Sequence, residues 1–82
     1  MVARTNLARV YAAQRRYEEA FEQFEAALEH DPHDVDAHRH YGLTLLKRGR
    51  RQLAAHHLAL VVEVRPDDQE ARRALDRALA PG

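Results

Sequence analysis

The sequence predicts an all-α fold built from antiparallel helix-turn-helix repeats. Apolar side chains recur at spacings of three and four residues along most of the chain, which is the pattern of amphipathic helices. Residues of similar size also recur 34 residues apart, as shown by Phe24 and Leu58 and by Pro32 and Pro66. A period of this length indicates that one supersecondary unit is stacked on its copy.

The composition is that of a single small domain that lacks several kinds of reactive group. An 82-residue chain buries only about 60–65% of its unfolded surface, so we expect one core over residues 1–82. Cysteine is absent, which excludes disulfides and thiolate chemistry. Thirteen basic residues balance thirteen acidic ones, so no net charge favours nucleic acid or an anionic membrane. No signal peptide or membrane span is recognisable, so we expect a cytoplasmic protein.

The first repeat, residues 1–34, is predicted to contain two helices. The first covers residues 2–14, and the stripe on its inner face is Ala3, Leu7, Val10, Tyr11 and Gln14. The second follows Arg15 and Arg16 and has glutamates on its outer face. Its inner stripe is Tyr17, Ala20, Phe21, Phe24, Ala27 and Leu28. This helix should end at Asp31, because Pro32 has no backbone N–H and disfavours a helical residue before it.

The second repeat, residues 35–68, is predicted to have the same form. Its first helix should begin at His33 or Asp34 and run to about Arg48, where Gly49 can adopt the left-handed conformation that ends it. Its second helix should cover about residues 52–64. The branched residues of 58–64 would also suit a buried strand, but the copy of this segment, 24–30, is glutamate-rich, which favours a helix.

The last predicted element is a capping helix over residues 69–80. Asp67 and Glu70 have the spacing of a capping box, in which each side chain accepts from the other's backbone N–H. The inner stripe is Ala71, Ala74, Leu75, Ala78 and Leu79. Asp76 stands where the repeats have Ala8 and Gly42, so a further helix could not pack closely there. The chain is therefore either a short protein or the C-terminal part of a longer array.

These packing positions resemble those of the tetratricopeptide repeat, a helix-turn-helix unit. The matching residues are Leu7, Ala8, Tyr11, Ala20, Phe24, Ala27 and Pro32, then Tyr41, Gly42, Leu45, Ala54, Leu58, Val61 and Pro66. The resemblance covers the whole chain and implies a short right-handed solenoid that acts as a protein-protein interaction module or scaffold. Two positions depart from the family: its frequent tryptophan is Arg4 and His38 here, and the glycine expected after the first helix is Arg15.

In such an array, partners usually bind the concave face formed by the first helix of each repeat and the cap. The residues expected to bind a partner there are Thr5, Asn6, Arg9, Arg39, His40, Leu43, Lys47 and Arg73, with Glu70 and Arg77 on the same face. The face is basic, which favours an acidic peptide, although the charges could also be simply solvated. The family's clamp for chaperone tails uses lysine and asparagine. None of the matching residues, Thr5, Arg9, His40, Glu70 and Ala74, is of the type the clamp uses.

Self-association is the alternative function. The fourth helix carries a second apolar stripe, Leu53, His57, Leu60 and Val64. The capping helix could cover His57 and Val64, whereas Leu53 and Leu60 should remain accessible. A second copy could contact these leucines, or the uncapped end of the array at Val2 and Val10.

Other functions are not expected. Only one pair of the six histidines, His30 and His33, has the helical spacing of metal ligands, and Pro32 lies between them. Serine, cysteine and a glycine-rich loop are all missing, so neither an enzyme nor a bound cofactor is predicted. RNA binding has only the basic segment 48–51 in its favour, against a neutral chain, so no nucleic-acid partner is expected.

Overall fold

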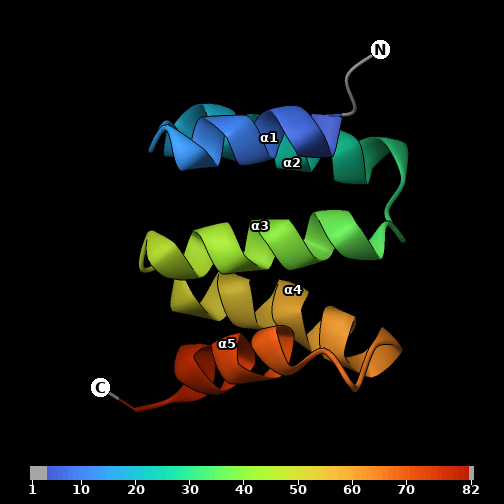
Figure 1. Cartoon of the computed structure of the whole chain (residues 1–82), viewed down its shortest axis with the longest axis vertical. Helices are drawn as coiled ribbons and strands as arrows, with labels where there is room; N and C mark the ends of the chain where they lie inside the picture. The colour runs from blue at the N-terminus through green and yellow to red at the C-terminus, as the bar shows by residue number, and fades with distance from the viewer. Residues whose placement is uncertain (1–3, 82) are drawn as a thin grey trace.

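The computed structural model describes residues 4–81, which form five helices (Figure 1). Their bounds are α1 Arg4–Ala13, α2 Tyr17–His30, α3 Val35–Lys47, α4 Arg51–Val64 and α5 Gln69–Leu79. No strand occurs in this part of the chain, and the segment that could also have suited a strand lies within α4. The predicted all-α fold is confirmed, with helix bounds within about two residues of those expected for α2 to α5.

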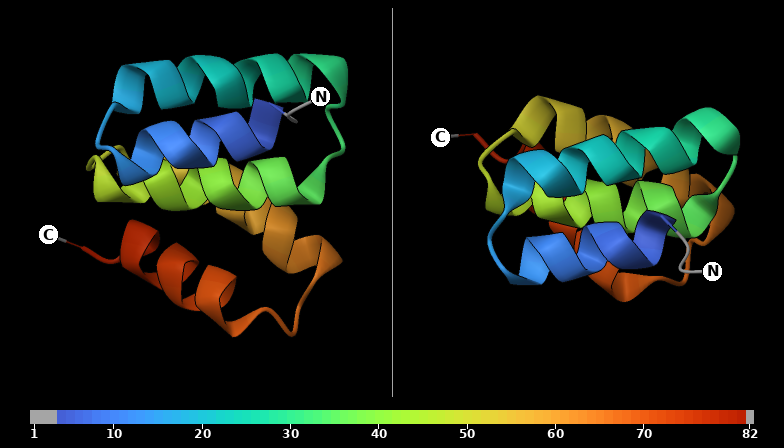
Figure 2. Two further views of the ribbon diagram at one scale, coloured as in Figure 1. Left: turned by 45° about the horizontal axis from the view of Figure 1, so that its top comes forward. Right: turned by 90° about the horizontal axis from the view of Figure 1, so that it is seen from above.

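The helices stack in two layers, and α3 is the central helix of one of them. Helix α1 packs on α2 and α3 on α4, each pair antiparallel, and α5 packs on α3 and α4. Figure 2 shows α1, α3 and α5 along one side of the stack and α2 and α4 along the other. Helix α3 contacts all four other helices, so it contributes side chains to both sides of the molecule.

The core depends on small residues that let paired helices approach closely. Phe24, Leu45, Leu58 and Val61 are the largest side chains that are fully buried, and Phe24 stacks on Tyr41 with ring centroids 5.3 Å apart. Ala8, Ala20 and Ala54 are also fully buried. At Gly42 a Cβ atom would lie only 2.7 Å from Leu58 Cγ. Glycine at this position therefore sets the distance between α3 and α4.

The two turns inside the repeats adopt the same backbone conformation with different residues. Gly49 has φ of 83°, and Arg15, its counterpart 34 residues earlier, has φ of 61°. A residue with a Cβ atom is strained in this left-handed region by about 1–2 kcal/mol. The chain thus keeps the geometry of the turn although the expected glycine is an arginine.

Aspartates provide the N-caps of α3, which begins the second repeat, and of α5, the capping helix. Asp34 accepts a hydrogen bond from the Ala37 backbone N–H, and Asp68 accepts one from Ala71, at 3.2 and 3.0 Å. The prediction that Asp67 and Glu70 cap α5 together was wrong, because Asp68 is the capping residue. Asp34 and Asp68 are 34 residues apart, so the repeat period itself indicates the correct one.

Two apolar side chains are more exposed than predicted. Val64 and Leu79 have exposed fractions of 61% and 66%. Val10, which the sequence placed at the uncapped end of the array, is 50% exposed. The capping helix was expected to cover Val64, but Val64 is the last residue of α4 and α5 leaves it exposed. Leu79 is the counterpart of Leu45, which is fully buried, and no helix follows α5 among the described residues to cover it.

The helices of residues 4–81 are all too short or too polar to span a lipid bilayer.

Candidate functional site

One side of the molecule carries a groove between α3 and α5. Seen from above in Figure 2, α1 and α5 project beyond α3, so α3 lies at the floor of this side. A cavity of about 470 Å³ opens between α3 and α5. It is lined by Leu43, Leu46, Lys47, Glu70, Arg73, Ala74 and Arg77. We call it the α3–α5 groove.

The structure places the expected site residues in two parts of this face. Leu43, Lys47 and Arg73 meet in the α3–α5 groove. Thr5, Asn6 and Arg9 lie on α1, with Asn6 and Arg9 exposed and Thr5 half-buried. His40 is half-buried on α3, close enough to Arg9 of α1 and to Glu70 of α5 for both charges to influence its pKa. Val2, which was expected to support self-association, is outside the described residues.

The α3–α5 groove combines an apolar floor with a basic rim. Leu43 and Leu46 are half-buried and Ala74 is buried, whereas Lys47, Arg73 and Arg77 are exposed. Glu70 is the one acidic residue of the lining, and its carboxylate accepts a hydrogen bond from Arg39. The three exposed cations therefore give the mouth of the groove a positive charge. Sequence reasoning missed Leu46, although it is one helical turn from Leu43 and so faces the same way.

Arg39 is engaged within the molecule. Its Nε donates to Asp68 Oδ2 at 2.7 Å, and its Nη2 donates to Glu70, while only 20% of its side chain is exposed. These hydrogen bonds raise the pKa of Arg39 above its usual value, and the bond from Arg39 lowers that of Asp68. Arg39 thus joins α3 to the first turn of α5, and its charge is already balanced.

His40 provides a neutral polar group on the same face. Its partial burial lowers its pKa, and the positive charges of Arg9 and Arg39 lower it further. The neutral imidazole both donates and accepts a hydrogen bond, which suits contact with a peptide backbone.

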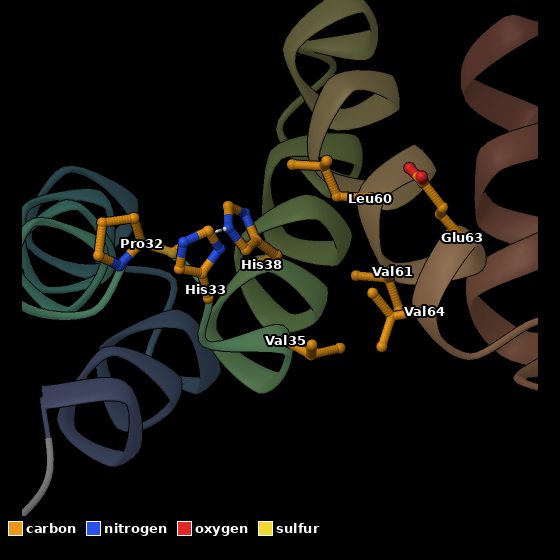
Figure 3. Close-up of a pocket in the computed structure, with 8 residues that line it drawn as sticks. All are labelled: Pro32, His33, Val35, His38, Leu60, Val61, Glu63 and Val64. Atoms are coloured by element: carbon orange, nitrogen blue, oxygen red, sulfur yellow. Dashed lines mark hydrogen bonds between the residues drawn. The ribbon is translucent and has the colours of Figure 1, made fainter.

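The opposite side of the molecule has a smaller pocket of about 220 Å³, shown in Figure 3. It lies between the α2–α3 turn and the last two turns of α4. Its lining is Pro32, His33, Val35, His38, Leu60, Val61, Glu63 and Val64. We call it the α4 pocket. Leu53 and Leu60, the predicted self-association residues on this helix, have exposed fractions of 41% and 38%.

A histidine pair beside this pocket was not foreseen from the sequence. His38 Nε2 donates to the Pro32 carbonyl oxygen at 2.7 Å, which leaves His38 Nδ1 to accept from His57 Nδ1 at 2.9 Å. His57 is buried against the Tyr41 ring, and burial together with His38 and His56 lowers its pKa to about 4. Residues 4–81 contain no cluster of three side chains suited to a metal ion.

The stacked helix pairs define an all-α helical-repeat fold. The family model for the tetratricopeptide repeat matches residues 11–79, and the chain belongs to this family. The repeat is a non-catalytic helical fold, and domains built from it generally mediate protein-protein interactions or scaffolding. None of the curated proteins matches the chain.

Proposed function

We propose that the protein binds an acidic peptide segment in the α3–α5 groove. The observation that carries this proposal is the arrangement of three exposed cations, Lys47, Arg73 and Arg77, around a floor formed by Leu43 and Leu46. A cavity with apolar walls and a few polar groups at its edge is the usual form of a binding site.

The charge of the rim determines the class of peptide. Arginine binds carboxylates through two parallel hydrogen bonds, so Arg73 and Arg77 suit aspartate or glutamate side chains or a C-terminal carboxylate. The floor suits an aliphatic side chain next to the acidic residues. Thr5, Asn6, Arg9 and His40 would continue the contact toward α1. Arg39 is not counted among the free cations, because Asp68 and Glu70 already balance its charge.

Fluorescence anisotropy with labelled ten-residue peptides tests the proposal. One peptide carries four glutamates and a central leucine, a second replaces leucine by glycine, and a third replaces the glutamates by lysines. We expect the first to bind most tightly, the second more weakly and the third not at all. Binding should weaken as salt is raised, since exposed charges are screened.

Two charge reversals on α5 provide a matched comparison. Arg73→Glu removes a cation of the groove, whereas Arg72→Glu changes a neighbouring exposed arginine that does not line it. We expect Arg73→Glu to weaken binding by about 1–3 kcal/mol and Arg72→Glu to have a much smaller effect. Equal effects of the two reversals would contradict this binding site.

A second candidate function, self-association, is favoured by a separate observation: α4 exposes Leu53, Leu60 and Val64 on the opposite side of the molecule.

A further inference from the structure

Helix α4 presents an exposed apolar strip to solvent. Leu53, Leu60 and Val64 have exposed fractions of 41%, 38% and 61%. Their spacings of seven and four residues place them on one face of the helix, as in the contact seam of a helix pair. At about 1.5 Å per residue, the strip is roughly 16 Å long. It is long enough to pair with another helix.

A hole and a protruding side chain lie at opposite ends of this strip. The α4 pocket is at the C-terminal end, where Leu60, Val61 and Val64 meet Val35 of α3 (Figure 3). Its 220 Å³ exceeds the roughly 150 Å³ that holds a benzene-sized group, so it can accept a leucine side chain. Leu53 is the exposed leucine at the other end.

We propose that a second copy of this chain docks on α4, with the two α4 helices antiparallel about a twofold axis. If the axis passes near the midpoint between Leu53 and Val64, each Leu53 lies opposite Val64 of the other copy, at the mouth of its α4 pocket. The arrangement is self-complementary, because each copy provides one protruding leucine and one pocket. A closed dimer results.

Charge complementarity supports an antiparallel second copy. Arg50 lies at the start of α4, while Glu63 and Asp67 lie at and just beyond its end. Arg51 and Arg65 also lie at these ends, but Arg51 donates to backbone carbonyl oxygens of α5 and Arg65 is paired with Asp36, so neither is counted here. Antiparallel pairing brings the basic start of one helix to the acidic end of the other, whereas a parallel pair would place like charges together. The helix dipoles favour the same orientation.

The expected dimer is weak. One short helix pair buries less than the roughly 1,200–2,000 Å² of a stable interface, so association should require high micromolar concentrations. The proposal is independent of peptide binding, because the α3–α5 groove and the α4 pocket share no residue.

Sedimentation equilibrium between about 20 µM and 1 mM tests the dimer. We expect the mass to rise from 9.4 kDa toward twice that value. Leu53→Glu and Val64→Lys should each weaken self-association at least tenfold. An equimolar mixture of these two variants should recover association, because one contact keeps leucine in an unaltered pocket and the other pairs the introduced carboxylate with the introduced ammonium group.

Val10→Glu is the matched control, since Val10 is an equally exposed apolar residue on α1. It should leave the dimer unchanged, as should Arg73→Glu in the groove. All these positions are exposed, so circular dichroism should show unchanged helix content. A monomer mass up to 1 mM, a dimer insensitive to Leu53→Glu, or a mixture that associates no better than either variant alone would each overturn the proposal.

Discussion

Replacing Gly42 by alanine tests the close approach of α3 and α4. The new Cβ atom would lie 2.7 Å from Leu58 Cγ and 3.0 Å from Leu58 Cδ2, well inside the roughly 3.5–4.0 Å of a normal carbon contact. Leu58 is fully buried and cannot move into solvent. Overpacking of this kind costs about 1–3 kcal/mol.

Helix propensity acts in the opposite direction. Alanine is better than glycine inside a helix by about 1 kcal/mol, so Gly42→Ala would stabilise the protein if the space were free. Combining the two effects, we expect a net loss of up to about 2 kcal/mol in the free energy of unfolding. Urea denaturation followed by circular dichroism measures this change.

A double-mutant cycle separates the two effects. In the background of Leu58→Ala, the clash is absent and only the propensity remains, so Gly42→Ala should then stabilise the protein by about 1 kcal/mol. Ala8 is the counterpart of Gly42 in the first repeat and is fully buried, which shows that the corresponding space there admits a methyl group. If Gly42→Ala changed the free energy of unfolding in the same direction in the wild-type and the Leu58→Ala backgrounds, the reasoning would be refuted.

Three further predictions concern turns, pH and helix capping. Arg15→Gly should raise the stability by about 1 kcal/mol and Gly49→Ala should lower it similarly, because both residues have positive φ; thermal unfolding of the two variants checks this. The folded pKa of His57, about 4, lies below its unfolded value of 6.5, so the unfolded chain binds the proton first as pH falls. Urea titrations at several pH values should therefore show stability falling between pH 6.5 and 4, by up to about 3 kcal/mol. The fall should be much smaller in His57→Gln and only slightly smaller in His56→Gln, because His56 is the weakest of the three causes that lower the His57 pKa. Asp68→Asn retains a capping side chain but loses the ion pair, so it should cost about 1 kcal/mol, and Asp68→Ala about 2, in urea denaturation.

The fold was predictable because its determinants are local and repeated. Helical spacing identified the inner stripes, Pro32 and Pro66 marked the ends of two helices, and the period linked each element to its copy. The same period could have corrected the one wrong cap, since Asp68 is the copy of Asp34. Exposure was harder to predict at the ends of helices, as Val64 shows, because it depends on where neighbouring elements turn away.

Contacts without a copy in the other repeat could not be predicted. Arg39 forms an ion pair with Asp68, 29 residues away. The first repeat has no equivalent pair, because the counterpart of Arg39 there is Thr5. The pair of His38 and His57 likewise bridges two helices and has no equivalent in the first repeat, where the counterparts are Arg4 and Gln23. Both contacts require knowledge of how the helices are placed in space.

The two proposed surfaces lie on opposite sides of α3, and this arrangement has a physical consequence. Leu43 and Lys47 of α3 line the α3–α5 groove, while Val35 and His38 line the α4 pocket. Since the surfaces share no residue, pairing through α4 would leave the groove of each copy open. A dimer would then present two grooves, and a partner with two acidic segments would be held more tightly than one with a single segment, because its second segment binds at a high effective concentration.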